Sequence, residues 1–166
     1  IRRQRQMCIR DRVMAGINVT GKDILKINYS IMGNDSDVTY NMARMKEVDK
    51  DSSEYQTSSE KFRKKTENGY AYYIIEDIGE EYEENGNSQS EGIQIVKFSK
   101  QLGEESLYQD RQVYNEMVKN MYEGLTLSVT VTYGDGTTEI VDVGLKEVGG
   151  GDNSGKVSDK VAVYVK

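Results

Sequence analysis

Histidine is absent from the 166-residue sequence, and this absence narrows the classes of function. Histidine is the commonest general base in enzymes and the partner of the nucleophile in Ser-His and Cys-His catalytic pairs. It is also a usual ligand of zinc. Catalysis by two carboxylates needs no histidine, but the 28 acidic residues are scattered and offer no distinct pair. We therefore expect no enzymatic activity and no catalytic residue.

Long apolar runs and cysteine are also scarce. No apolar stretch approaches the roughly 20 residues that span a bilayer, so we expect no membrane insertion of this segment. Cys8 is the single cysteine and lies in an unusual N-terminal segment. The rest of the chain therefore has no thiol for a disulfide, a metal or a nucleophile.

That N-terminal segment, Ile1 to Arg12, has five arginines in twelve residues. Its sequence, IRRQRQMCIRDR, resembles a translated sequencing adapter of the kind that contaminates the ends of gene sequences. We expect it to be non-native and to take no part in the fold; a genuine segment of this kind would be a basic arm for nucleic acid or anionic lipid. Without it, 17 basic residues stand against 27 acidic ones, a net charge of −10 that disfavours nucleic acid as a partner.

Alternation of apolar and polar residues predicts a mainly β chain. Residues 25–31 alternate, with Leu25, Ile27, Tyr29 and Ile31 on one face. Residues 125–133 alternate most regularly, which predicts that the valines at 129 and 131 are buried and the threonines at 130 and 132 face solvent.

A hairpin is predicted around Asn68-Gly69, because this pair favours the type I′ turn between two strands. The second strand of this hairpin, residues 70–77, is rich in β-forming residues on both faces, so we expect it to have a neighbour on each side. Residues 79–92 are rich in glutamate and predict an acidic loop.

One segment has a helical period. Residues 110–123 carry apolar side chains at four-residue steps and predict one amphipathic helix, capped by Asp110 and ended by Gly124. The glycine-rich residues 149–155 predict a loop or linker. Residues 156–166 then either close the sheet or begin a further module, so the main domain is expected to cover residues 13–148.

The number of strands decides the expected fold class. Eight or nine short strands, with turn residues between them and no regular alternation with helices, predict an antiparallel β-sandwich with one inserted amphipathic helix. The alternative is an α+β fold in which the helix lies across one side of a single antiparallel sheet.

A resemblance adds to this prediction. The run LTLSVTVTYGDGTTEIVDVGL, from Leu125 to Leu145, resembles the closing hairpin of immunoglobulin-like repeats in surface proteins of Gram-positive bacteria. Such repeats often lack cysteine and use strands rich in Thr and Val around a Gly-Asp-Gly turn. The resemblance covers about 21 residues. It implies an immunoglobulin-like sandwich and an extracellular or cell-surface location in a bacterium.

One set of acidic residues has a spacing that binds calcium elsewhere. Asp49, Asp51, Ser53 and Glu60 occupy positions 1, 3, 5 and 12 of a loop resembling an EF-hand. Position 6, where glycine permits a sharp turn, is Glu54. We therefore expect weak calcium binding or none, and no other cofactor.

Tyrosine is the main candidate for recognition, with twelve tyrosines against two phenylalanines and no tryptophan. Exposed tyrosine stacks on sugars and lines protein interfaces, because its ring is apolar and its hydroxyl reaches water. The candidate ligand-binding residues are Tyr70, Tyr72 and Tyr73, with Tyr82 beside the acidic loop. The alternative is that one alternating set packs in the core and the other faces solvent.

Three functions agree with these observations. The first is a non-catalytic structural or adhesive module, with neighbouring domains of the same chain and a glycan or protein ligand as partners. The second is a carbohydrate-binding module of a secreted enzyme, and the third is a weak calcium-binding domain. Contiguous solvent-facing tyrosines in a groove would favour the second, and converging carboxylates between residues 49 and 60 the third.

Overall fold

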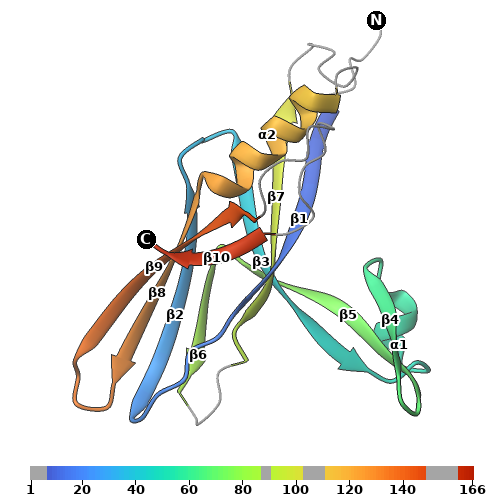
Figure 1. Ribbon diagram of the computed structural model, residues 1–166. Helices are drawn as coiled ribbons and strands as arrows, with labels where there is room; N and C mark the ends of the chain where they lie inside the picture. Colours follow the sequence, from blue (N-terminus) through green and yellow to red (C-terminus); the bar gives the residue numbers. More distant parts are fainter. Residues whose placement is uncertain (1–6, 87–90, 103–110, 149–160) are drawn as a thin grey trace, which may run out of the picture.

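The computed structural model describes residues 7–86, 91–102, 111–148 and 161–166 (Figure 1). These residues form two five-stranded antiparallel sheets with the hydrophobic core between them, and the predicted β-sandwich is confirmed. The first sheet consists, from edge to edge, of β1 (Met7–Ile17), β7 (Ile93–Leu102), β3 (Val38–Val48), β5 (Gly69–Gly79) and β4 (Lys61–Thr66). The second consists of β10 (Val161–Val165), β9 (Thr138–Glu147), β8 (Leu125–Tyr133), β2 (Ile24–Gly33) and β6 (Glu81–Asn85). The helices in the described part of the chain are α1 (Ser53–Thr57) and α2 (Arg111–Glu123).

Strand β8 shows how alternation builds the core. Its apolar side chains at 125, 127, 129 and 131 are all buried, so the predicted register is confirmed. Thr130 and Thr132 point away from the core but are only partly exposed, because β2 and β9 flank β8 on both sides.

Strand β2 follows the prediction at three of four positions. Ile27, Tyr29 and Ile31 are buried, but Leu25 is 59% exposed. The pairing of β2 with β8 shifts register between Ile24 and Lys26, and Ile24 packs against the core. A bulge of this kind reverses the side-chain direction that strict alternation predicts.

Helix α2 lies over one end of the sandwich (Figure 1) and contacts β9 and β1. Val118, Met121 and Tyr122 are its buried side chains. The Tyr40 hydroxyl donates a hydrogen bond to the Met121 carbonyl at 2.6 Å, which joins the helix to β3. The predicted helix is therefore confirmed, while its expected cap, Asp110, lies outside the described residues.

The structure differs from the expectation for the N-terminal segment. Residues 7–12 form the first part of β1 and pair in register with residues 97–102 of β7. Composition does not reveal this role, because a strand at a sheet edge is held by its backbone hydrogen bonds. The non-native origin of this segment stays a prediction.

Two further expectations need correction. Residues 79–92 are not a loop throughout, because β6 lies within them and pairs with β2. The alternation of β6 was hidden because its buried position is itself a glutamate, Glu84. The hairpin at Asn68-Gly69 exists, but Thr66 pairs with Gly69, so Glu67 and Asn68 form the turn. Asn68 does not have the positive φ of a type I′ turn, whereas Gly69 has a φ of +130°.

The end of the chain belongs to the sandwich. Strand β10 pairs antiparallel with β9, so the final residues close the second sheet. This pairing agrees with the first of the two roles considered for residues 156–166. The expected glycine-rich loop, residues 149–155, lies outside the described part of the chain.

One part of the first sheet extends beyond the sandwich. Figure 1 shows β4, α1 and the adjoining ends of β3 and β5 projecting to one side of the two packed sheets. We call residues 45–75 the arm. No residue from 44 to 80 is fully buried, whereas the core strands alternate between buried and accessible side chains.

Candidate functional site

The arm has two faces, and the strand register assigns its side chains to them. Residues opposite each other in antiparallel strands point to the same face. Arg63 is opposite Tyr72, and Lys65 is opposite Tyr70, whereas Phe62 is opposite Tyr73. Two of the predicted tyrosines thus share one face, and the third lies on the other.

The face of Tyr70 and Tyr72 is partly covered by α1. The Tyr55 ring from α1 meets Tyr72 edge-on, with ring centroids 5.2 Å apart. Ser52 caps this short helix, because its hydroxyl accepts a hydrogen bond from the Tyr55 backbone N–H. The Arg63 guanidinium lies 4.5 Å from the centroid of Tyr70.

The opposite face repeats the same combination of aromatic and cationic groups. Phe62 and Tyr73 stack with centroids 5.3 Å apart and an interplanar angle of 16°. The Lys64 ammonium lies 5.8 Å from both centroids. Each such cation–π contact contributes about 0.5–1 kcal/mol at an exposed site. The arm is therefore held together by aromatic and cationic contacts on its surface.

These contacts decide what the tyrosines can bind. A sugar needs an open aromatic ring on which to stack. The Tyr73 ring stacks on Phe62, and Arg63 covers one side of the Tyr70 ring, which is 50% exposed. The three tyrosines also point to both sides of the arm rather than into one groove. The arrangement does not provide the contiguous tyrosine platform that would favour a carbohydrate module.

Tyr82, the fourth candidate, lies apart from the others in β6. Its ring stacks on the buried Tyr29 with centroids 6.2 Å apart, and the Arg44 guanidinium lies 4.9 Å from its centroid. Burial raises the pKa of the Tyr82 hydroxyl, against the opposing effect of Arg44. Tyr82 thus belongs to the junction between arm and sandwich.

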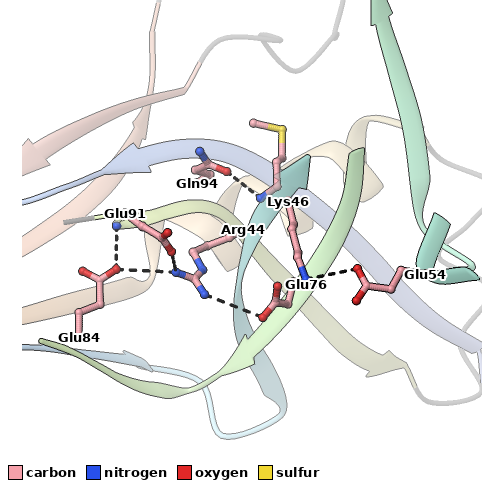
Figure 2. A network of polar contacts seen from close by, with 9 residues as sticks. Arg44, Lys46, Glu54, Glu76, Glu84, Glu91 and Gln94 are labelled. Carbon is pink, nitrogen blue, oxygen red and sulfur yellow. Dashed lines mark hydrogen bonds and ion pairs between the residues drawn. The ribbon is translucent and has the colours of Figure 1, made fainter. Parts of the chain in front are cut away.

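Arg44 is the centre of that junction (Figure 2). Its guanidinium forms ion pairs with Glu91, with Glu84 at 3.8 Å and with Glu76 at 3.9 Å. Glu84 comes from the second sheet, whereas Arg44 and Glu76 are cross-strand partners in the first. The cluster therefore joins the two sheets at the place where β3 leaves the core.

The buried Glu84 receives further hydrogen bonds. The Tyr29 hydroxyl donates to one carboxylate oxygen at 3.1 Å, and the Gly92 N–H donates to the other at 3.0 Å. Gly92 has a φ of +68°, and a Cβ at this position would lie 2.1 Å from the Ile17 carbonyl oxygen. Only glycine fits here, so the backbone donor to Glu84 depends on this residue.

A second contact fixes the other side of the arm. The Lys97 ammonium in β7 pairs with Glu60 and, at 2.7 Å, with Asp77. Burial alone would lower the pKa of Lys97, but its hydrogen bonds to Asp77 and Glu60 outweigh this effect and raise it. Glu60, the proposed twelfth position of a calcium loop, is therefore engaged by a cation of the sandwich.

The other members of the proposed calcium loop serve the turn before α1. The Asp49 carboxylate accepts a hydrogen bond from the Asp51 N–H at 3.2 Å, and Ser53 begins the helix. Within residues 7–86, 91–102, 111–148 and 161–166, no three acidic or thiol side chains come together in a manner that holds a metal ion. The loop therefore lacks the converging carboxylates of a calcium site.

A feature that the sequence analysis did not single out is the charge of β4. Its sequence, KFRKKT, has cations at four of six positions. Five of its side chains are exposed, and only Phe62 is partly covered. The run of cations in an otherwise acidic chain is the sequence feature that could have drawn attention to β4. The strand order shows that β4 lies at the outer edge of the arm.

Neither helix in the described part of the chain is long and apolar enough to cross a membrane.

Comparison with known proteins adds no family to this description. No family model, no curated protein and no solved structure matches this chain.

Proposed function

We propose that this chain is a non-catalytic adhesive module of a larger extracellular or cell-surface protein, in which the sandwich presents the arm to a binding partner. The observation that carries the proposal is the absence of any fully buried residue from 44 to 80, although the segment holds five aromatic rings. A small β-sheet without a buried face is only marginally stable in water. A partner that covers this surface would supply the missing burial.

The junction supports this proposal. Arg44 joins the two sheets where the arm begins, through ion pairs with Glu76 and Glu84. Lys97 of β7 forms an ion pair with Glu60 of the arm itself. A surface that is held in place before binding loses less conformational freedom when the partner arrives. The sandwich thus serves as a rigid support.

The setting follows from the resemblance of residues 125–145 to bacterial immunoglobulin-like repeats. Such a module has neighbouring domains of the same chain as partners, and its own ligand is a glycan or a protein. The engagement of Tyr70 and Tyr73 by neighbouring side chains favours the adhesive function over a carbohydrate platform.

Deletion of the arm tests the proposal. Met45 and Ile75 are cross-strand partners, so a variant that joins them through an Asn-Gly turn removes residues 46–74 while it keeps the sandwich strands. Intact and armless chains are immobilised and compared against a panel of glycans and of acidic and basic proteins. We expect the armless chain to retain its melting temperature within a few degrees and to lose whatever binding the intact chain shows.

A second variant keeps the backbone of the arm and replaces Arg63 and Tyr70 with serine. It provides the same comparison if the armless chain does not fold. Equal binding by the intact and altered chains, or no binding by the intact chain to any panel member, would contradict the proposed function.

A further inference from the structure

We propose that the free edge of β4 binds an extended acidic peptide, which adds to the first sheet as a further strand. This inference rests on the proposed function and names the partner class of the arm. It follows from the position of β4, the direction of its backbone groups and its charge.

Among the described residues, β4 is an edge strand whose one sheet neighbour is β5. The Ile75 N–H donates to the Glu60 carbonyl at 3.1 Å, immediately before β4 begins. In an antiparallel pair, residues that bond to the partner strand alternate with residues whose backbone groups point away. Phe62 and Lys64 therefore bond to β5, while three residues direct their N–H and C=O groups to the free edge: Lys61, Arg63 and Lys65.

These outward backbone groups form a template for strand addition. An incoming strand would hydrogen-bond to them and extend the sheet, which is how peptides bind to the edges of several recognition domains. The six residues of β4 span about 20 Å, so the matching peptide segment has about six residues in contact. The backbone geometry selects an extended peptide as the occupant.

Charge selects which peptide binds. Residues with outward backbone groups carry positive side chains at all three positions, and Lys64 adds a fourth charge on the opposite face. Like charges directly opposite each other destabilise a strand pair, whereas opposite charges stabilise it. A strand with Glu or Asp at alternate positions therefore fits β4.

The same rule excludes one alternative occupant, the β4 strand of a second copy. An antiparallel pairing centred on Arg63 would place Arg63 opposite Arg63 and Lys61 opposite Lys65. All three opposed pairs would repel. The cations thus prevent edge-to-edge association of identical chains, as charged edge strands do in other β proteins, and leave an acidic strand as the favoured addition.

Binding of a labelled peptide tests the inference directly. The probe has about eight residues that alternate Glu with Val or Thr, and its control carries N-methyl groups on alternate residues, which remove backbone donors but keep every charge. We expect the intact chain to bind the first peptide and to bind the methylated peptide at least tenfold more weakly. Equal affinity for both peptides would overturn strand addition.

A pair of substitutions at Arg63 separates charge from backbone. Arg63→Gln removes the cation and keeps the outward N–H, whereas Arg63→Pro removes both without breaking a hydrogen bond to β5. One hydrogen bond corresponds to a factor of about five in affinity, so Arg63→Pro should bind about fivefold more weakly than Arg63→Gln. Lys22→Gln, an exposed cation outside the arm, is the matched control and should leave the affinity unchanged.

The remaining outcomes distinguish this inference from the proposed function. A sulfated glycan and single-stranded DNA are tested beside the peptides, because both present negative charge without a strand backbone. Binding of either of these to the intact chain but not to the armless chain, without binding of the acidic peptide, would overturn the partner class and support the function of the arm. Equal binding of the acidic peptide to intact and armless chains would overturn the inference.

Discussion

The sandwich and the arm are both antiparallel β-sheet, but they are stabilised in different ways. In the sandwich, each core strand has a second sheet opposite it, and alternate side chains such as Leu127 and Val129 are buried. In the arm, β4 and β5 are paired strands as well, yet none of their side chains is fully buried. The comparison shows that strand pairing does not by itself bury side chains, and that burial depends on a facing layer.

The arm replaces core packing with contacts at its surface. Its rings pack against cations and against each other, as Phe62 and Tyr73 do, and the ion pair of Glu60 with Lys97 joins it to the sandwich. Surface contacts of this kind contribute less than burial of apolar area, because water competes for the same groups. We therefore expect the arm to open more readily than the sandwich.

Hydrogen exchange should show the largest contrast. The amide of Ile75, bonded to the Glu60 carbonyl, should exchange through local opening of the arm, whereas the amide of Val129 needs opening of the sandwich. We expect exchange in the arm to be about a hundredfold faster or more, because few buried contacts oppose its opening. Equal protection of the two amides, measured by NMR, would show that arm and sandwich unfold as one unit.

Truncation of apolar side chains should give the next largest contrast. Leu127 is 1% exposed, so Leu127→Ala should lower the free energy of unfolding by about 2–5 kcal/mol through lost burial and a residual cavity. Phe62→Ala in the arm should cost about 1 kcal/mol or less, since the ring is only partly covered. Chemical denaturation of both variants measures the difference. Similar costs would indicate that the arm contributes a core of its own.

The junction should have an intermediate effect. Arg44→Ala leaves the buried Glu84 without its cation, and we expect a loss of about 2–3 kcal/mol in the free energy of unfolding. The double variant Arg44→Ala, Glu84→Gln should recover part of this loss, because the charge that is removed together with Arg44 is the buried one. If the double variant is no more stable than Arg44→Ala, the ion pair is not the reason for the loss. Thermal and chemical denaturation distinguish the outcomes.

The smallest expected effect concerns a buried hydroxyl in the sandwich. The Tyr122 hydroxyl has no hydrogen-bond partner among the residues that the structure describes. An unsatisfied buried polar group costs stability, so Tyr122→Phe should leave the free energy of unfolding unchanged or raise it by about 1 kcal/mol. A loss of more than 1 kcal/mol on chemical denaturation would show that the hydroxyl has a partner.

The same residue gives a test by pH. Burial, with smaller effects from Glu147 and Glu123, raises the pKa of Tyr122 to about 12 from an ordinary value of 10.0. The folded chain therefore keeps a proton that the unfolded chain loses, and the contribution of Tyr122 is complete below pH 10 and is lost as the pH rises toward 12. Tyr122→Phe should make the decline of stability in this range less steep. An unchanged slope would contradict the raised pKa.

The sequence predicted the positions of most strands better than it predicted which side chains they bury. The alternation in β8 predicted its buried valines, and the four-residue period predicted α2, because both patterns follow from local backbone geometry. The exposure of Leu25 was not predictable from the pattern, since a bulge changes one side-chain direction without changing the composition. The strand at Glu84 was also missed, because its buried residue is charged and its partners lie elsewhere in the chain.

In the candidate site too, the sequence indicated which residues to consider, and the tertiary structure decided how they are arranged. Sequence composition drew attention to Tyr70, Tyr72 and Tyr73, and all three lie in the arm. Their division between two faces depends on strand register, and the engagement of Glu60 by Lys97 depends on a contact across 37 positions. The free edge of β4 was likewise visible only once the neighbours of each strand were known.

By itself, the sequence of this protein determined where most strands and the longer helix form, with β6 and the first part of β1 as exceptions, because side-chain period and turn residues act over a few neighbouring positions. The tertiary structure alone decided which faces are covered. Strand β8 has a sheet opposite it, whereas β4 and the adjoining end of β5 project to one side of the two packed sheets (Figure 1). The side chains of this projecting part are partly or fully exposed. The reason is that burial depends on contacts between segments far apart in the chain, which no local pattern encodes.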